Sequence, residues 1–343
     1  MEPAMTTKRT EIENSPFKTI QIHPSRKCNL SCLHCYSSSS PHYSQMLDIE
    51  ALKSFLGYAK EQGYNNISLS GGEPFLYKNL EELLKFSKSL GFQNALATNG
   101  MLLQSDRNQN MLQFIDIIAI SIDGKKELHD KIRGLAGAFE KMLKGVDILN
   151  THEKYFGFIH TITPESWEDL IWLGDFAYDH NAKLLQLHPL EMYGRALEEL
   201  KDCSLDDTLA YKAFILSNYL TDKYRNKMII QLDLLHKEYL KDFPEIVNPF
   251  CKASETYTKI SDYFDTIIVD DFGKIIPLAY GFNQKYCLGN INSLKDSAFD
   301  DYISEKMGKL KKLYSDTLTK VFSENGTDVF NWNEIIVHES RFI

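Results

Sequence analysis

Hydrophobic residues follow two alternating periods along the chain, and this alternation predicts the order of its secondary-structure elements. Short runs rich in β-branched and aromatic residues predict strands, and longer stretches with an apolar residue every three or four positions predict helices. The predicted strands cover residues 17–23, 66–70, 94–98, 116–123, 155–163 and 183–190. The predicted helices cover residues 48–63, 80–91, 137–152, 164–181 (with Pro164 in the first turn) and a segment near 205–225.

This order is typical of an α/β protein in which helices cover a parallel sheet. Six strand–helix units follow one another up to about residue 225, so we expect a partial (β/α)6 barrel of parallel strands over residues 17–225. The reactive groups of such sheets gather at the C-terminal ends of the strands. Loops that follow predicted strands are therefore the first places to look for chemistry.

The alternation of predicted strands and helices ends after about residue 226. Residues 226–343 are expected to form an appended α+β module. Within it, DTIIVDDFGKIIPLAY (265–280) predicts a β-hairpin around an Asp-Phe-Gly turn. A helix near 296–322 and a strand-like run, NEIIVHES (333–340), are predicted to follow. At the other end, residues 1–16 are polar and charged and lack the apolar region of a signal peptide, so they are predicted to be a flexible tail.

Composition narrows the classes of function. The net charge of -9 argues against a nucleic-acid partner, because phosphate binding needs a basic surface. No apolar run reaches the roughly 18 residues of a membrane span, so no membrane partner is expected. Six cysteines are too few for a disulfide scaffold in a chain of 343 residues. We therefore expect a cytoplasmic protein whose clustered thiols serve a metal or catalysis.

Three of the cysteines, Cys28, Cys32 and Cys35, form a CxxxCxxC segment directly after the first predicted strand. A closed structural zinc site would need a fourth ligand. The histidines available for that role are His23, His34 and His42. A cubane iron–sulfur cluster usually takes four thiolates, so three would leave one iron with an open coordination site. Zinc and iron–sulfur chemistry both remain open on the cysteines alone.

Further motifs follow the next strands: SGGEP (70–74), ATNG (97–100), SIDG (121–124) and HDKIRG (129–134). Together with CxxxCxxC they resemble the signature of the radical S-adenosylmethionine (SAM) superfamily, over residues 17 to about 200. The resemblance implies one 4Fe-4S cluster held by the three cysteines, with SAM on the open iron. It also implies that an electron donor such as flavodoxin or ferredoxin drives cleavage of SAM to a 5′-deoxyadenosyl radical, which abstracts a hydrogen from the substrate.

The same resemblance implies a set of SAM-binding residues but assigns no catalytic acid or base. Two glycines let the backbone approach a ligand, and Glu73 can accept hydrogen bonds from an ammonium group. His34 stands where many relatives carry an aromatic residue against adenine, and Ser121 and Arg133 match positions used for ribose and carboxylate. The implied SAM-binding residues are Gly71, Gly72, Glu73, Pro74, His34, Asn99, Ser121 and Arg133. Structural alternatives are a strand-end hydroxyl for Ser121, a surface ion pair for Arg133 and a turn residue for Asn99.

Two later segments resemble a subfamily with a C-terminal extension. HPLEMYGRA (188–196) resembles a "P…GRA" segment, which implies that Gly194 approaches the adenine, and Glu191 and Arg195 are expected to pair with each other. Residues 251–291 resemble the SPASM/Twitch extension. Leu278 stands where the extension's hairpin carries a cysteine, and the thiols left outside the first motif are Cys203, Cys251 and Cys287. A closed cluster needs about four ligands, so this module is predicted to lack an auxiliary cluster.

The substrate is expected to be a peptide or a small molecule. Most relatives with this extension modify ribosomally made peptides, so a peptide-modifying radical SAM enzyme is the leading hypothesis. The HCYS sequence at the third cysteine also resembles tetrapyrrole side-chain enzymes of the haem d1 or alternative haem biosynthesis type, which is the second hypothesis. A third hypothesis, from a different class, is a non-catalytic zinc or iron–sulfur binding protein.

Overall fold

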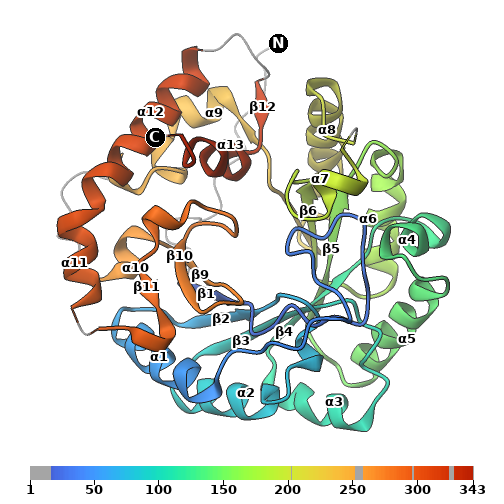
Figure 1. Ribbon diagram of the computed structural model, residues 1–343. Helices are drawn as coiled ribbons and strands as arrows, with labels where there is room; N and C mark the ends of the chain where they lie inside the picture. The colour runs from blue at the N-terminus through green and yellow to red at the C-terminus, as the bar shows by residue number, and fades with distance from the viewer. Residues whose placement is uncertain (1–16, 202, 252–257, 296, 324–327, 343) are drawn as a thin grey trace.

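A ten-stranded sheet runs through the computed structural model of the chain, and helices cover its outer face (Figure 1). The structure describes residues 17–201, 203–251, 258–295, 297–323 and 328–342. The predicted tail at residues 1–16 lies outside them. Among the described helices, none is both long enough and apolar enough to cross a membrane.

The strand order of the sheet is β11-β10-β9-β1-β2-β3-β4-β5-β6-β7. All neighbours from β9 to β7 pair in parallel, while β10 pairs antiparallel with both β9 and β11. The strands are β1 (Thr19–Ile22), β2 (Asn66–Leu69), β3 (Gln93–Thr98), β4 (Ile117–Ser121), β5 (Phe156–Ile162), β6 (Leu184–Pro189), β7 (Ile229–Leu232), β9 (Thr266–Val269), β10 (Lys274–Pro277) and β11 (Gly289–Asn290). A separate two-stranded ribbon joins β8 (Leu235–His236) to β12 (Val329–Phe330). The six predicted strands and the α/β fold class are therefore confirmed.

Helices alternate with the strands as the periodicity predicted. The helices of the barrel are α1 (Ile49–Glu61), α2 (Leu80–Ser89), α3 (Asp106–Met111), α4 (Lys126–Arg133), α5 (Ala138–Thr151), α6 (Leu170–Asp179), α7 (Ala196–Glu199) and α8 (Asp207–Lys223). Their apolar residues pack on the buried side chains of the sheet, for example Leu52 and Phe55 of α1. Asp48 caps α1 by accepting a hydrogen bond from the Ala51 N–H at 3.0 Å.

The predicted helix start at Pro164 is wrong. Helix α6 begins at Leu170, after a 3₁₀ turn over Trp167–Asp169. The side chains of Thr163 and Ser166 cause the delay: the Thr163 N–H donates to Ser166 Oγ at 2.9 Å, and the Ser166 N–H donates to Thr163 Oγ1 at 3.2 Å. These side-chain-to-backbone bonds hold Pro164 in a turn before the helix.

Strands β7, β9, β10 and β11 of the C-terminal part continue the barrel sheet, whereas β8 and β12 form the separate ribbon. Strand β9 lies parallel to β1, with Thr19 opposite Thr266 and Ile22 opposite Val269. Strand β7, at the opposite edge of the sheet, also comes after the expected boundary near residue 225 in the sequence. It pairs with β6 of the barrel. The sheet is thus continuous across residues that the sequence assigns to two units.

The predicted hairpin is confirmed as β9 and β10 around the turn at 270–273. The strand predicted over 333–340 is wrong, because this segment forms helix α13 (Trp332–Glu339). Asn331 caps that helix: its side chain accepts from the N–H groups of Asn333 and Glu334, and Trp332 and Ile336 bury one face. The remaining helices of this part are α9 (Lys237–Asp242), α10 (Ile260–Tyr263), α11 (Ala298–Glu305) and α12 (Met307–Ser323).

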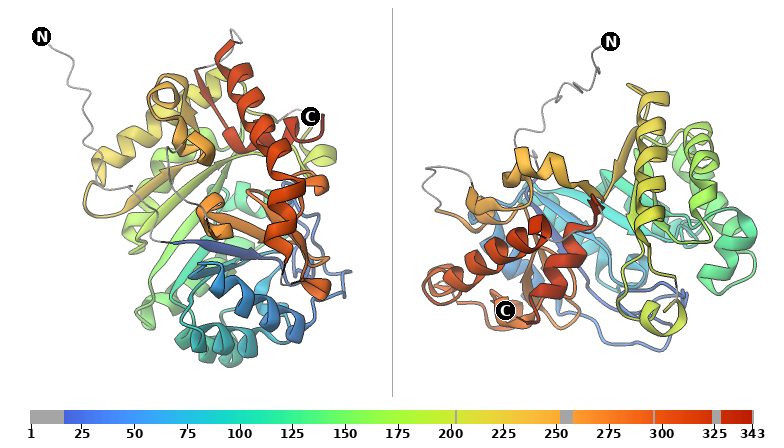
Figure 2. Two further views of the ribbon diagram at one scale, coloured as in Figure 1. Left: turned by 90° about the vertical axis from the view of Figure 1, so that its left-hand side faces the viewer. Right: turned by 90° about the horizontal axis from the view of Figure 1, so that it is seen from above.

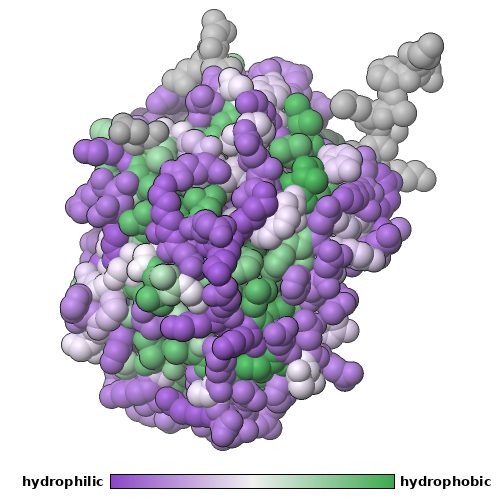
Figure 3. All heavy atoms as spheres, turned by 90° about the vertical axis from the view of Figure 1, so that its right-hand side faces the viewer, coloured by the Kyte–Doolittle hydropathy of each residue, from purple (hydrophilic) through white to green (hydrophobic). Residues whose placement is uncertain are grey.

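Helices α11, α12 and α13 lie together on one side of the molecule, and α8 lies away from them at the other edge of the sheet (Figure 2). Figure 3 shows the face on the right-hand side of Figure 1, where hydrophobic residues are exposed between hydrophilic ones. Scattered apolar exposure of this kind is usual for a folded chain. The chemistry is better sought where the strands end.

Candidate functional site

The inner face of the sheet carries small and polar side chains that remain partly accessible. Side chains alternate between the two faces of a strand, and the buried residues that face the helices are mostly isoleucine, leucine and phenylalanine. The residues between them on the opposite face include Ser68, Ser70, Ala95, Ala97, Ala119, Ser121, Thr161, Gln186 and His188, all of intermediate exposure. A barrel filled by its own side chains would bury these positions. This inner face therefore leaves room for a ligand.

The cysteine loop follows β1 directly and lies at the carboxyl edge of the sheet. Cys28 and Cys32 are buried and Cys35 is partly exposed, and all three pack with Leu30 and neighbours in one small apolar cluster. The Ser39 N–H donates to Cys35 Sγ at 3.3 Å. The structure therefore brings the three predicted ligand residues together.

Burial raises the pKa of the Cys28 thiol to about 12, and the charges of Glu73, Cys32 and Cys35 add to the rise. Thiolate ligands need a compensating positive charge, which a bound metal centre supplies. Among the described residues, no three His, Cys, Asp or Glu side chains already converge on a single metal ion. In a cubane each cysteine binds a different iron, so its ligands need not meet at one point. The buried thiols therefore fit such a cluster.

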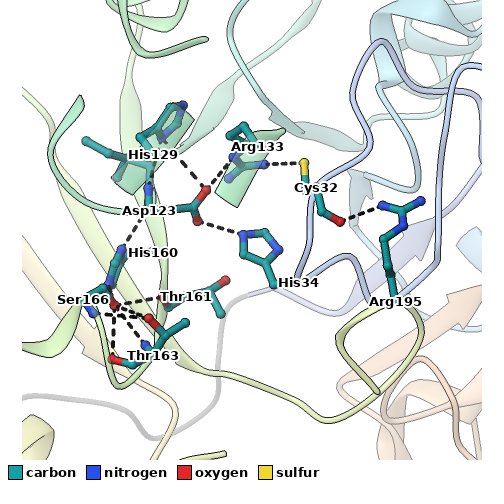
Figure 4. A network of polar contacts seen from close by, with 11 residues as sticks. Cys32, His34, Asp123, His129, Arg133, His160, Thr161, Thr163, Ser166 and Arg195 are labelled. Carbon is teal, nitrogen blue, oxygen red and sulfur yellow. Dashed lines mark hydrogen bonds and ion pairs between the residues drawn. The ribbon is translucent and has the colours of Figure 1, made fainter. Parts of the chain in front are cut away.

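A buried ionic network lies beside the cysteine loop (Figure 4). Asp123, which follows β4, contacts His34 Nε2 through Oδ1 at 2.9 Å and pairs with Arg133 Nε through Oδ2 at 2.5 Å. Arg133 also donates from Nη1 to Cys32 Sγ at 3.6 Å. Burial alone would raise the pKa of Asp123, but Arg133 and His34 hold it well below its usual range. Arg133 thus neutralises Asp123 and lies beside the Cys32 thiol at the same time.

Two of the predicted SAM-binding residues, His34 and Arg133, already bind other side chains of the protein in this network. His34 directs its ring nitrogen to Asp123, and Arg133 is buried between Asp123 and Cys32. Arg133 is therefore not the surface ion pair that was its alternative. Their roles toward SAM stay predictions, and their structural role is to join the cysteine loop to β4 and α4.

The two glycines after β2 are needed because another part of the chain passes close by. Gly71 has a φ of +103°, and a Cβ on it would lie 2.7 Å from the Ser25 carbonyl oxygen. A Cβ on Gly72 would lie 2.1 Å from the carbonyl oxygen of Lys27. The N–H of Gly72 donates to Ser25 O, and the N–H of Glu73 donates to Lys27 O, both at 2.9 Å. Glycine here docks the turn onto the start of the cysteine loop.

The carboxylate of Glu73 is buried and already accepts three hydrogen bonds from the protein. Oε1 accepts from Thr98 Oγ1 at 2.8 Å and from the Phe75 N–H at 3.3 Å, and Oε2 accepts from the Asn99 N–H at 3.0 Å. A carboxylate has about four acceptor sites, so one remains for a ligand. Burial raises the pKa of Glu73 to about 7 even though these three bonds lower it.

The other predicted SAM-binding residues lie at the same edge. Pro74 is buried as the first residue of a 3₁₀ turn over Pro74–Leu76. The Asn99 side chain donates to Asn29 Oδ1 at 2.8 Å and accepts from the Met101 N–H at 3.0 Å, so it ties its turn to the cysteine loop. Ser121 ends β4 on the inner face with intermediate exposure.

The loop after β6 clamps the cysteine loop. A Cβ on Gly194, which has a φ of +59°, would lie 2.1 Å from Tyr36 O, so this glycine allows contact with the chain and not only with a ligand. The expected pair of Glu191 with Arg195 is wrong. The Arg195 guanidinium instead donates to the carbonyl oxygens of Cys32 at 2.6 Å and Ser39 at 2.7 Å. The guanidinium is thus directed to the backbone of the cysteine loop and not to Glu191.

Two features of the site were missed at the level of sequence. His188 at the end of β6 forms an ion pair with Asp233, which follows β7, and Glu191 and Glu334 lie near this pair. His23 stacks on the ring of Tyr280, with 4.8 Å between centroids, and Tyr36 meets the same ring edge-on. The sequence did offer one signal for the pair of His188 with Asp233. Both residues lie at the C-terminal end of a strand, where the reactive groups of a parallel sheet gather.

Cys203, Cys251 and Cys287 lie outside the apolar cluster that contains Cys28, Cys32 and Cys35. Cys287 is buried and donates to the carbonyl oxygens of Gly289 at 2.9 Å and Ile275 at 3.1 Å. Cys251 is exposed and Cys203 partly exposed. Leu278 has a φ of +71° and packs against the core.

The family comparison agrees with this geometry. Residues 22–177 match the family described as the Radical SAM superfamily. That superfamily uses a 4Fe-4S cluster and SAM. The match includes the three cysteines, the SGGEP turn and the network around Asp123.

Curated relatives of two kinds resemble the chain. Fe-coproporphyrin III synthase of Methanosarcina barkeri is 26% identical over 247 residues, which cover 69% of this chain and 60% of that protein. The antilisterial bacteriocin subtilosin biosynthesis protein AlbA of Bacillus subtilis is 22% identical over 285 residues, covering 82% of this chain and 59% of that protein. The chain therefore spans about three-fifths of the length of these relatives.

Among solved structures, SuiB of Streptococcus suis bound to S-adenosylmethionine superposes with a TM-score of 0.66 at 19% identity. The match covers 87% of this chain and 68% of that one. At this identity the likeness establishes the fold, including the C-terminal part.

Proposed function

We propose that this chain, which carries a radical SAM domain over residues 22–177, is a radical SAM enzyme that modifies a ribosomally made peptide. The observation that carries the proposal is the position of the three-cysteine loop at the carboxyl edge of a sheet whose inner face is open and polar. In this proposal Cys28, Cys32 and Cys35 hold one 4Fe-4S cluster, and SAM lies against the inner face.

When bound, the cluster and SAM supply a one-electron cleavage that yields a hydrogen-abstracting radical; the protein supplies position and exclusion of water. Arg195 and the Asp123 network fix the loop that carries the thiols. Glu73 offers its remaining acceptor site to the methionine ammonium. The electron would come from a small donor such as flavodoxin or ferredoxin.

A peptide substrate is supported by similarity across most of the chain. AlbA, a bacteriocin biosynthesis protein, matches 82% of this chain, and a SuiB structure that holds the precursor peptide SuiA superposes over 86% with a TM-score of 0.63. Both matches extend into the C-terminal part, which in this chain joins the barrel sheet through β9.

The second candidate is a tetrapyrrole side-chain enzyme. The observation that favours it is the match to Fe-coproporphyrin III synthase at 26% identity over 69% of this chain. That relative, like AlbA, is longer than this chain.

The radical chemistry is tested by SAM cleavage. The reconstituted chain is expected to release 5′-deoxyadenosine under dithionite, and a variant with Cys28, Cys32 and Cys35 changed to alanine is expected to release none. The Cys251→Ala variant is the matched control, because it removes an exposed thiol far from the loop in sequence. Equal product from the wild type and the triple variant would refute the proposal, and would leave a non-catalytic metal-binding protein as the better account.

The substrate class is tested by mass spectrometry. A peptide encoded next to this chain's gene is expected to change mass only when incubated with the chain, SAM and a reductant. The same reaction with coproporphyrin III tests the second candidate. A mass change of the porphyrin alone would favour that candidate.

A further inference from the structure

A cavity of about 790 Å³ lies between the cysteine loop and the C-terminal part of the chain. Its lining residues come from three segments of the chain and from Arg26 and Arg341. The segments are 36–38 of the cysteine loop, 193–197 after β6, and 270–284, which includes the turn and second strand of the β9–β10 hairpin. Pockets that hold small ligands measure roughly 300–1,000 Å³. The cavity therefore has room for several side chains of a bound ligand.

Aromatic rings form one wall of the cavity. Tyr280 meets Tyr36 at 5.1 Å and Tyr193 at 6.2 Å between ring centroids, both edge-on. Tyr36 follows Cys35 directly, and its hydroxyl lies 3.3 Å from Ser70 Oγ at the end of β2. The aromatic wall therefore reaches from the C-terminal part to the cluster loop. A ligand on it would lie next to the site of the radical chemistry.

Two arginines, Arg26 and Arg341, line the cavity, although the chain as a whole carries -9. Arg341 is exposed, lies over the ring of Tyr193 at 5.4 Å, and has no described carboxylate within ion-pair distance. Arg26 is 4.0 Å from Asp271, and its buried Nε has no hydrogen-bond partner among the described residues. A separation of 4.0 Å is too long for a hydrogen bond, so Asp271 does not satisfy this donor.

The nearby carboxylates, Asp270 and Asp271, accept hydrogen bonds from their own surroundings and do not contact Arg341. Asp270 turns into its own hairpin, where Oδ1 accepts from the N–H groups of Phe272 at 2.9 Å and Lys274 at 2.8 Å. Asp271 accepts from the Tyr280 hydroxyl at 3.1 Å through its Oδ1. Arg341 is thus the cation of the cavity that is most available to a ligand.

We infer that this cavity binds a carboxylate-bearing ligand with an aromatic or bulky apolar body, and that Arg341 recognises the carboxylate. The inference rests on the proposed function in naming the source: an acidic segment of the substrate peptide in which glutamate or aspartate stands beside an aromatic residue. Guanidinium groups bind carboxylates through paired N–H donors, and aromatic walls select flat apolar groups. A tetrapyrrole with propionate groups shares this chemistry and is the other source to be tested.

The test uses the full chain with its cluster reconstituted, and two blocked peptides as probes: acetyl-Glu-Tyr-Glu-Tyr-amide and acetyl-Gln-Tyr-Gln-Tyr-amide. Isothermal titration calorimetry is expected to give about tenfold tighter binding of the glutamate peptide, and this preference should weaken as salt is added. Arg341→Gln should abolish the preference. Arg225→Gln is the matched control, because Arg225 is an exposed arginine paired with Asp222 outside the cavity and should leave the preference intact.

Coproporphyrin III is titrated in the same way. If it binds with the same dependence on Arg341 and the glutamate peptide does not, the carboxylate site stands and the peptide assignment of the proposed function fails. If neither ligand depends on Arg341, the cavity proposal is overturned. Because the 5′-deoxyadenosine assay needs neither ligand, failure of the cavity proposal and failure of the radical SAM proposal are read separately.

Discussion

Arg195 bridges the cysteine loop from Cys32 to Ser39. Its Nη1 donates to the Cys32 carbonyl at 2.6 Å, its Nη2 donates to the Ser39 carbonyl at 2.7 Å, and its backbone N–H donates to the Cys35 carbonyl at 2.9 Å. The chain from Cys32 to Ser39 carries two of the three proposed cluster ligands, Cys32 and Cys35. One side chain from the loop after β6 therefore fixes their spacing.

We predict that Arg195→Gln speeds the loss of the reconstituted cluster. The variant loses two charge-assisted hydrogen bonds, worth about 1.5–3 kcal/mol each at most, so the loop opens more often. The measurement is the decay of the cluster's visible absorbance in the presence of a chelator. Arg107→Gln is the control, because Arg107 also donates to a carbonyl, that of Lys78, but is exposed and outside the site. Equal decay for wild type and Arg195→Gln would contradict the clamp.

Asp123→Asn is predicted to destabilise the metal-free chain by about 3–5 kcal/mol. The change removes the buried partner of Arg133 and leaves a buried guanidinium without a countercharge. Urea unfolding followed by circular dichroism measures the effect. Asp222→Asn removes an exposed ion pair with Arg225 and should change stability by less than about 1 kcal/mol. A similar small change at Asp123 would mean that Arg133 finds another partner.

Glu73→Gln is predicted to act on stability as well as on the binding of SAM. An amide nitrogen would face the donors of Thr98, Phe75 or Asn99, which costs about 1–3 kcal/mol in unfolding free energy. SAM affinity should fall roughly tenfold with the lost charge. Thermal unfolding and equilibrium dialysis measure the two effects. Glu81→Gln, an exposed change on α2, is the control. Unchanged SAM affinity would show that the carboxylate serves the fold alone.

The iron content of the chain is predicted to be about four per molecule, as for one cubane. The Cys251→Ala/Cys287→Ala double variant should retain it, because the Cys287 thiol donates to the backbone carbonyls of Ile275 and Gly289. Iron analysis after anaerobic reconstitution measures this, with the Cys28→Ala/Cys32→Ala variant as the positive control. Extra iron in the wild type that disappears in the first variant would establish an auxiliary cluster.

The pair of His188 with Asp233 is predicted to make stability depend on pH. Burial lowers the pKa of His188, but the hydrogen bond and charge of Asp233 outweigh it, so the pKa lies above the usual value of 6.5. A raised folded-state pKa stabilises the fold fully below about 6.5, and this stabilisation is lost as pH rises through the folded value. Wild type should therefore exceed His188→Gln in stability by up to about 1 kcal/mol at pH 6, and by less at pH 9, since His188 is about one-third exposed.

Urea midpoints of the metal-free wild type and His188→Gln at both values of pH measure this difference. His152→Gln, which changes an exposed histidine after α5, is the matched control for replacing an imidazole with an amide. A difference that grows between pH 6 and pH 9 would show the opposite linkage.

Sequence patterns predicted the strands and helices of the barrel well where a single local preference, such as alternating hydrophobicity or a helix cap, applied to a segment. Strands such as β3 and β6 alternate buried and accessible residues, and helices such as α1 carry their own cap. The pattern failed where two local rules competed. Pro164 favours a first helical turn, but the side chains of Thr163 and Ser166 hold it in a separate turn, and the apolar run after Asn331 became a capped helix.

By itself, the sequence determined the strand–helix order and the three cysteines that share one loop, because periodicity and spacing are local properties of the chain. Tertiary structure decided what the surrounding residues do. Glycines at 71, 72 and 194 serve close contacts between distant segments, and Arg195 reaches back to Cys32. Strand β9 pairs with β1 across more than 200 residues. Such contacts join segments that are far apart in the sequence. Local patterns of hydrophobic and polar residues therefore do not predict them.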